Sequence, residues 1–209
     1  MNYHKRRAQK SREALLAAAE SAFLENGYSD TSIDVILQAS GVSRQTLFSH
    51  FGSKENLFLE MCNTMFLREL PELQPSVDYF SGLVDFLFTY SSVVMRDRNV
   101  ASLRLAITES RKFPELSFNR YKQGSSKMIA MLHEYLKEGM TKGLIRECDS
   151  IVLTEQLLMS TLGYRQYRAL LGNSDNPASA EQYIKTALLG VVTTKGKNRL
   201  KKIPLFADL

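Results

Sequence analysis

The segment ASGVSRQTLFSHF, residues 39–51, constrains the fold more than any other part of the chain. Apolar residues recur at helical spacing on both sides of Gly41, and glycine suits the left-handed conformation that ends one helix before another begins. We therefore expect helices at 32–40 and 43–50, joined by a tight turn at 41–43. Such a pair is typical of a helix-turn-helix, whose second helix enters the major groove of DNA. Because unrelated folds also contain helical hairpins, the flanking sequence has to decide.

The flanking residues complete a small helical domain. Apolar side chains follow one helical face through residues 11–25, and Gly27 supplies a stop. A longer helix is expected from about 54 to 70, where Pro71 and Pro75 end it. The first three helices therefore form a compact group, and a long helix leads out of them.

The remainder of the chain is predicted to be helical as well. Only 11 Gly and 5 Pro occur among 209 residues, whereas Leu, Ala, Lys and Glu, which lose little rotamer freedom in a helix, are frequent. Further helices are expected at about 77–96, 100–112, 115–142, 150–171 and 178–194. The predicted fold class is all-α, with about nine helices.

The helix pattern and the charges predict three parts. A helix-turn-helix domain with a basic N-terminal arm covers 1–52, a larger helical domain covers 53–196, and a basic C-terminal tail covers 197–209. With 44% hydrophobic residues, the chain has enough apolar side chains for a packed core.

Positive charge gathers at the two ends of a chain whose net charge is +5. The basic residues that precede the first acid are His4, Lys5, Arg6, Arg7, Lys10 and Arg12. They fit a polyanion-binding arm and a solvated, frayed terminus equally well. The second group is Lys195, Lys197, Arg199, Lys201 and Lys202. For it we favour a solvated tail, because Gly196 and Pro204 interrupt the pattern.

The sequence lacks the patterns of an enzyme, a metal site or a membrane span. Cys62 and Cys148 fit neither a disulfide framework nor a zinc cluster, and no two of the three histidines lie at ligand spacing. Nucleophile motifs, glycine-rich phosphate loops and clustered carboxylates are missing, as are apolar runs of ~18 residues. We expect a cytoplasmic, nucleoid-associated protein that is not an enzyme and uses no cofactor or metal.

The second helix of the motif carries side chains suited to DNA. Arg44 and Gln45 can each make paired hydrogen bonds to a base edge, so they are the candidate base readers. Thr46 suits a base or a phosphate, and Phe48 suits a thymine methyl group or the backbone. The candidate phosphate contacts are Thr31, Ser32, Ser43, Ser49, His50 and Lys54.

Structural roles compete with these assignments. Ser43 and Ser53 are suited to cap helices whether or not they contact DNA. Phe48 fits a core position, and His50 fits a packed position in which its polar tip is satisfied.

From Arg12 to Phe58 the chain resembles the DNA-binding domain of the TetR family of bacterial transcriptional repressors. The resemblance is carried by AAxxxFxxxGYxxTSI at 18–33 and by IxxAxGVSxxTLFxHFxSKExL at 36–57. Residues 104–109 and 113–116 resemble a segment of some regulatory domains in the family. The resemblance raises the expectation of DNA contacts for Thr31, Ser43, His50 and Lys54, which stand at contact positions of the family.

Three positions depart from the family pattern. Phe48 stands where the family commonly has Tyr, so a phosphate contact from that hydroxyl is lost. Gln45 replaces a frequent Gly or small residue and adds a potential base reader. Leu37 replaces the usual Ala, which implies a slightly larger separation between the two helices of the motif.

The resemblance implies an Ω-shaped homodimer. The helices at 150–171 and 178–194 would form a four-helix interface, and a ligand cavity would lie among the middle helices. Apolar stripes on both helices fit this interface, and the alternative is that they face the core of their own subunit. The stripes consist of Leu153, Leu157, Leu158, Leu162, Leu170, Ile184, Ala187, Leu188 and Val191.

Methionine and aromatic side chains of the middle helices suit an apolar pocket, although each also fits ordinary core. The candidate ligand-binding residues are Phe86, Tyr90, Arg104, Glu109, Met128, Met159 and Tyr164, with Arg104 or Glu109 as a polar anchor. The expected function is a repressor that binds a palindromic operator as a homodimer and is released by a small apolar or amphipathic ligand. Two alternatives stay open: a regulator that activates or acts without a ligand, and a helical adaptor that binds proteins.

Overall fold

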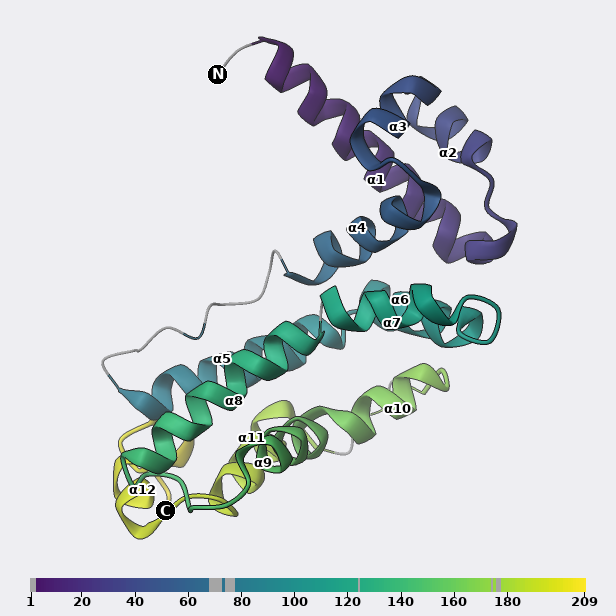
Figure 1. Ribbon diagram of the computed structural model, residues 1–209. Helices are drawn as coiled ribbons and strands as arrows, with labels where there is room; N and C mark the ends of the chain where they lie inside the picture. Colours follow the sequence, from purple (N-terminus) through teal and green to yellow (C-terminus); the bar gives the residue numbers. More distant parts are fainter. Residues whose placement is uncertain (1–2, 68–72, 74–77, 124, 174, 176–177) are drawn as a thin grey trace. The chain divides into compact units, whose positions relative to one another are not determined.

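The computed structural model describes residues 3–67, 73, 78–123, 125–173, 175 and 178–209. The chain forms two compact units: residues 1–68 with 101–124, and residues 69–100 with 125–209. Helices make up both units, and an isolated bridge between Ile145 and Val192 is the β-structure found in the described residues (Figure 1). The all-α prediction is confirmed.

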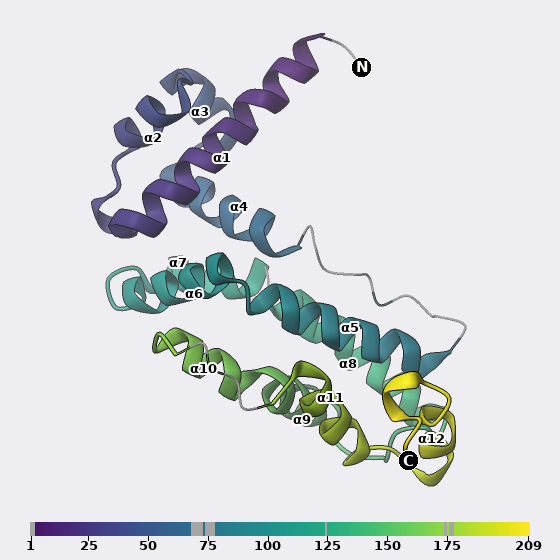
Figure 2. The same ribbon diagram turned by 180° about the vertical axis from the view of Figure 1, so that it is seen from behind.

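The first unit is built from the N-terminal helices and two later ones. Its elements are α1 (Tyr3–Asp30), α2 (Ile33–Ser40), α3 (Arg44–Phe51), α4 (Lys54–Leu67), most of α6 (Asp97–Glu109) and α7 (Pro114–Gln123). Helix α1 packs against α2 and α4, and α7 packs against α4. In Figure 2, α2 and α3 lie together along one side of α1.

The core of this unit consists of the apolar faces that the sequence pattern predicts. Its buried members include Leu15, Leu16, Ala19, Phe23, Ile36, Leu47, Phe51, Leu57, Phe58 and Leu116. The rings of Phe23 and Phe58 meet edge to face, with centroids 5.5 Å apart. Several helices are short and share one core, so each depends on packing against the others for stability.

Helix α1 is longer at its start than the sequence predicts. It begins at Tyr3, so the basic residues from His4 to Arg12 lie on a helix and not on a frayed terminus. At the other end, Gly27 has φ 84° and ψ 165°, which interrupts the helix where a stop is expected.

The second unit is a helical bundle. Its elements are α5 (Tyr79–Val94), α8 (Ser125–Thr141), α9 (Ser150–Leu158), a π-helix (Met159–Gly163), α10 (Tyr164–Leu170), α11 (Ala180–Leu189), α12 (Thr194–Leu200) and a 3-10 turn (Pro204–Phe206). The stretch 115–142, predicted as one helix, contains α7 and α8, and 150–171 contains a π segment. The predicted end of the helix at 54–70 lies outside the described residues.

Two tyrosines join α5 to α8. The Tyr79 hydroxyl donates to the Tyr135 carbonyl at 3.1 Å, and the Tyr135 hydroxyl donates to the Tyr79 carbonyl at 2.8 Å. Their rings stack with centroids 4.7 Å apart. The paired bonds satisfy two hydroxyl groups that burial would otherwise leave without partners.

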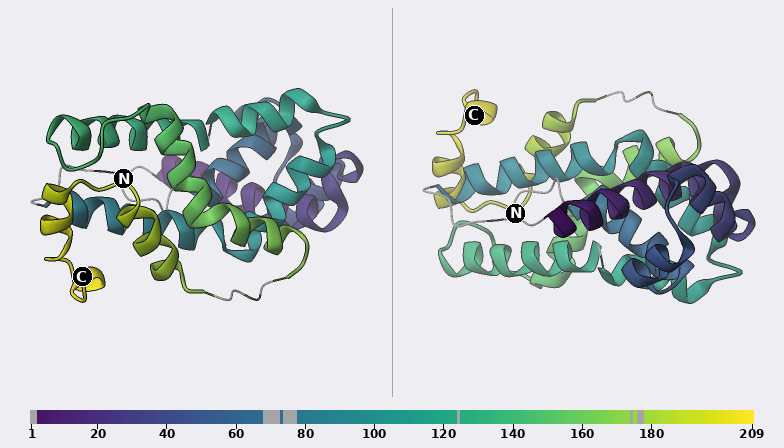
Figure 3. Two further views of the ribbon diagram at one scale, coloured as in Figure 1. Left: turned by 90° about the horizontal axis from the view of Figure 1, so that it is seen from below. Right: turned by 90° about the horizontal axis from the view of Figure 1, so that it is seen from above.

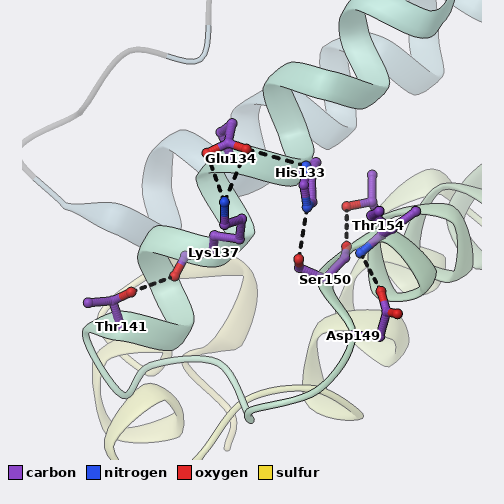
Figure 4. A network of polar contacts seen from close by, with 8 residues as sticks. His133, Glu134, Lys137, Thr141, Asp149, Ser150 and Thr154 are labelled. Carbon is purple, nitrogen blue, oxygen red and sulfur yellow. Dashed lines mark hydrogen bonds and ion pairs between the residues drawn. The ribbon is translucent and has the colours of Figure 1, made fainter.

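A polar network joins α8 to the start of α9 (Figure 4). His133 Nε2 and Ser150 Oγ are 2.8 Å apart, and His133 Nδ1 is 3.4 Å from a Glu134 carboxylate oxygen. The Asp149 carboxylate caps α9 by accepting from the N–H groups of Ile151 and Val152. The position of α9 is thus fixed by contacts as well as by its buried leucines.

The C-terminal residues are folded, and the basic side chains predicted to be solvated lie on this folded segment. The basic side chains are exposed, whereas Leu200 and Phe206 are fully buried. The Thr193 N–H donates to the Leu144 carbonyl at 3.1 Å, which attaches this segment to the connection between α8 and α9. Both views in Figure 3 show α12 at the end of the second unit. Regularly spaced apolar residues among the lysines supply the packing.

Candidate nucleic-acid interface

The reading head, which we define as α2, the turn and α3 (residues 32–52), has the expected helix-turn-helix geometry. Gly41 has φ 65°, and its N–H donates to the Leu37 carbonyl at 3.0 Å, closing α2. A side chain at this position would be strained because its backbone is left-handed. The chain then turns directly into α3.

Three serines cap helices at or beside the reading head. Ser32 Oγ accepts from the Val35 N–H, Ser43 Oγ from the Thr46 N–H, and Ser53 Oγ from the Asn56 N–H, over 3.3, 3.2 and 3.0 Å. The structural role considered for Ser43 and Ser53 is therefore confirmed. It does not exclude phosphate binding, since the uncapped N–H groups at these helix starts also favour anions.

Helix α3 buries one narrow stripe and exposes the rest. Leu47 is fully buried and Phe51 is nearly so, and Val42 is partly buried at the turn. The exposed side chains are Ser43, Arg44, Gln45, Phe48 and Ser49, and Thr46 and His50 are half-buried beside them. Phe48 is 41% exposed, so it is not the core aromatic of the alternative interpretation. The proposed DNA-contact side chains therefore share the outer side of α3.

Thr31 does not fit the predicted phosphate contact. Only 1% of the residue is exposed, and its hydroxyl is shared between the carbonyl oxygens of Ala22 and Gly27, at 2.9 and 2.7 Å. The hydroxyl instead ties the end of α1 to the start of the reading head. In the sequence Thr31 directly precedes Ser32, so it looks like a second polar residue at the start of α2 and its structural role is not evident.

Replacing Thr31 with Val is therefore expected to destabilise the first unit by about 1 kcal/mol, because two carbonyls lose their buried donor. The salt dependence of DNA binding should be unchanged, since no phosphate contact is removed. Thermal unfolding and DNA titrations at several salt concentrations check both parts. A weaker salt dependence in Thr31→Val would restore the phosphate assignment.

Lys54 lies at the start of α4 with its ammonium group 4.4 Å from the centroid of the Tyr28 ring. Burial lowers the pKa of Lys54, and Lys112 adds to this, while Glu109 and Asp30 oppose it. Lys54 thus remains a predicted phosphate contact that is already engaged with groups at the end of α1.

Glu109, at the end of α6, is hydrogen-bonded to the end of α1. Its carboxylate accepts from the Ser29 N–H at 3.0 Å and from the Ser29 hydroxyl at 2.9 Å, and Lys112 Nζ donates to the same hydroxyl at 3.1 Å. Burial would raise the pKa of Glu109, but the hydrogen bonds from Ser29 and the Tyr28 N–H and the nearby positive charge of Lys112 outweigh it, so the pKa is lowered. The Tyr28 ring packs edge to face on Phe113, 5.1 Å away. We call Ser29, Glu109 and Lys112 the α1–α6 clasp.

The structure disperses the candidate ligand-binding residues. Phe86, Tyr90 and Met128 are buried on α5 and α8 in the second unit, as a pocket or a core requires. Met159 and Tyr164 are 60% and 64% exposed, so they do not line an enclosed pocket of the described subunit. The other two belong to the first unit: Glu109 is held in the clasp, and Arg104 is exposed.

Asp34 and Arg165 have contacts of functional interest that were not predicted from the sequence. The Asp34 carboxylate binds the Arg44 guanidinium across the turn. Arg165 is half-buried: Nη1 donates to Ser91 Oγ at 2.7 Å, and the guanidinium lies 5.9 Å from the Tyr183 ring centroid. Its Nε has no hydrogen-bond partner among the described residues. Asp34 precedes Arg44 by ten residues across a short turn, and these opposite charges are the sequence signal that could have indicated the pair. Arg165 gives no local signal, because its partners lie far away in the sequence.

Other chemistry is not found in the part of the chain that the structure describes. No helix there has the length and apolar character needed to cross a membrane, and no cluster of His, Cys, Asp or Glu there is arranged to hold a metal ion.

Comparison with known proteins defines the class. Residues 15–61 match the model of the bacterial regulatory proteins of the tetR family, and residues 81–192 match that of the C-terminal domain of AefR-like transcriptional repressors. The chain belongs to the TetR family and is a helix-turn-helix transcriptional regulator, not an enzyme.

Individual relatives are similar over most of the chain. The regulator HbdR from Aromatoleum sp. (strain CIB) is 23% identical, covering 96% of this chain and 89% of its own. YhgD from Bacillus subtilis (strain 168) is 24% identical over 66% of this chain and 73% of its own. The solved structure of the flavonoid-responsive regulator FrrA is 30% identical, with a TM-score of 0.71, covering 89% of this chain and 99% of that one.

Proposed function

We propose that this regulator is a repressor that binds a palindromic operator as a homodimer and is released by a small apolar or amphipathic ligand. The observation that carries the DNA-binding part is the outer side of α3, where Arg44 and Gln45 lie exposed in the first turn above a buried Leu47. Such side chains can read base edges while the capped helix starts contact phosphates. A DNA-bound regulator of this kind works in the cytoplasm, on the nucleoid.

Exposed apolar side chains support a homodimer through α9, α10 and α11. Those on α9 to α10 are Ile151, Val152, Met159, Tyr164, Tyr167 and Leu171, each more than half exposed. A groove of about 230 Å³ beside them is lined in part by Ser160, Ala187 and Gly190. Small residues let a partner helix approach closely, and apolar patches of this kind mark protein interfaces. The predicted stripe itself differs, because Leu153, Leu157, Leu158, Leu162, Ile184, Leu188 and Val191 are buried in their own subunit.

Replacing Met159 with Glu is expected to weaken dimerisation by roughly 100-fold or more, because an unpaired charge in an apolar interface costs ~3–5 kcal/mol. Light scattering across a dilution series should show wild type at twice the 23.7 kDa chain mass and Met159→Glu at that mass. Phe88→Glu, which puts the same charge on an exposed apolar residue of α5, is the control and should stay dimeric. A dimeric Met159→Glu would move the interface elsewhere.

The second unit supports a ligand with an aromatic or apolar body and a polar group. Phe86 and Tyr90 stack with centroids 5.9 Å apart, and Met128 is buried in the same unit. Methionine and aromatic side chains adapt well to such ligands. Arg165, whose Nε has no partner in the described part of the chain, supplies a cation that a phenolate or carboxylate group could contact. The similarity to a flavonoid-responsive regulator agrees with this class of ligand.

Helix α6 supplies a route from ligand to reading head. Its first residues belong to the second unit and its later ones to the first, where Glu109 holds Ser29. A ligand lowers DNA affinity only if it binds more tightly to the conformation in which the separation of the two reading heads does not fit the operator. The clasp passes a shift of α6 to the end of α1.

The operator can be identified by selecting bound sequences from a pool of random DNA. A reporter gene whose promoter carries this operator then tests whether the protein lowers or raises transcription. The proposal predicts that the protein lowers transcription and that a planar, hydroxylated aromatic compound, chosen by its effect on the melting temperature, restores it. Raised transcription would indicate an activator. Repression that no stabilising compound relieves would favour a regulator without a ligand.

A further inference from the structure

Asp34 and Arg44 face each other across the turn of the reading head. Asp34 lies in the first turn of α2, Arg44 is the first residue of α3, and a carboxylate oxygen of Asp34 accepts from Arg44 Nη2. Their side chains are 77% and 53% exposed. The pair therefore lies on the outer surface, beside Gln45.

Stability does not explain this pair. Exposed ion pairs contribute only ~0–1 kcal/mol, because water screens them and two side chains lose freedom. Attraction to DNA does not explain it either, because a carboxylate next to a base reader repels phosphate. What remains is its effect on the geometry of Arg44.

We infer that Asp34 is a positioning residue that sets the base specificity of Arg44, an inference that rests on the proposed DNA-binding function. A guanidinium has five N–H donors in a planar fork, and the bond to Asp34 uses one of them. The remaining donors include a pair that can bind O6 and N7 of guanine. Asp34 fixes the orientation of the guanidinium plane of Arg44. Arg44 therefore approaches a base pair in one orientation only.

The negative charge of Asp34 adds selectivity by a second route. A long, unrestrained arginine binds any nearby phosphate, which strengthens binding to all sequences. With its guanidinium held by Asp34, Arg44 gains less from a phosphate and loses less freedom when it meets guanine. Asp34 thus lowers affinity for DNA in general and raises the difference between the right and the wrong base.

The experiment uses the full-length protein and duplexes made from the operator selected from random DNA, each changed at one symmetric base-pair position. The variants are Asp34→Ala, Arg44→Ala and the double variant. Glu25→Ala, which removes an exposed acid of α1, is the matched control for charge. Dissociation constants for every duplex and for unrelated DNA are measured at fixed salt.

Arg44→Ala should reduce discrimination at one position by about 5- to 150-fold, the equivalent of ~1–3 kcal/mol. Asp34→Ala should lose up to about 5-fold of the same discrimination, because an exposed pair is worth at most ~1 kcal/mol. It should also bind unrelated DNA more tightly, and it should have no further effect on discrimination once Arg44 is Ala. Glu25→Ala should keep the wild-type preference.

Full discrimination in Asp34→Ala beside a loss in Arg44→Ala overturns the positioning role and leaves the proposed function intact. A loss in Asp34→Ala that persists in the Arg44→Ala background also overturns it, because Asp34 would then act without Arg44. Failure of the wild-type protein to select any sequence is a different result, since it removes the proposed function itself.

Discussion

Leu47→Ala is expected to lower the free energy of unfolding of the first unit by about 2–5 kcal/mol, the usual cost of a large-to-small change at a buried leucine. Leu47 is fully buried and is the central apolar contact of α3 with the core of that unit. Because α3 has only eight residues, it is not stable without this packing. Binding to the operator should fall with the folded fraction of the reading head.

The neighbouring Phe48→Ala variant is the matched control. Phe48 is 41% exposed on the other side of the same helix, so its removal should change stability by less than ~1 kcal/mol while still weakening DNA binding. Hydrogen exchange followed by mass spectrometry separates the two units, and should show faster exchange in α2 and α3 of Leu47→Ala alone. Greater destabilisation by Phe48→Ala would mean that α3 is rotated about its axis.

The second large effect is expected at the α1–α6 clasp. Glu109→Gln should destabilise the first unit by about 2–3 kcal/mol, because hydrogen bonds to a charged, buried acceptor are worth more than neutral ones and an amide accepts through one oxygen only. Chemical denaturation at neutral pH measures the loss. Glu115→Gln, which changes an exposed acid of α7, should leave stability almost unchanged.

The same clasp predicts a dependence on pH. The pKa of Glu109 is lowered below its ordinary value of 4.5 in the folded protein, so its contribution is fully present above that value. The contribution is lost as the pH falls through the lowered pKa, because the unfolded chain then binds the proton more readily. Lys112 and Lys54 are the cations that face this carboxylate. Melting temperatures from neutral to acidic pH should therefore fall more steeply for wild type than for Glu109→Gln, and parallel curves would contradict the account.

The clasp variant also tests the route of coupling. If α6 transmits the ligand signal through Glu109, then Glu109→Gln should bind the operator and the ligand, yet respond less in operator affinity when the ligand is added. An unchanged response would place the coupling outside the clasp.

The reading head could be predicted from the sequence because its signals are local. Gly41 fixes the turn, Ser43 caps the next helix, and the spacing of Leu47 and Phe51 sets which side is buried. Each depends on neighbours within one or two helical turns. Thr31 is the exception, because its hydroxyl binds the carbonyl groups of Ala22 and Gly27 near the end of α1.

The later helices of the chain resisted prediction because their signals are not local. Periodicity places the leucines of α9 on one apolar face but does not say whether that face packs in its own subunit. These leucines are buried, and the exposed apolar face is a different one that includes Met159 and Tyr164. Glu109 reads as a charge on a helix end, although its partner Ser29 is 80 positions away. The C-terminal basic side chains are exposed as expected, but the burial of Phe206 in the same segment was not predicted.

The central claim is that α3 reads a palindromic DNA site as part of a homodimer. Incubating the full-length protein with a pool of random-sequence duplexes and sequencing the bound fraction after several rounds tests it most directly. The account predicts enrichment of an inverted repeat whose half-sites lie about one helical turn or more apart. Equal recovery of all sequences, or enrichment of a site without two-fold symmetry, would contradict it.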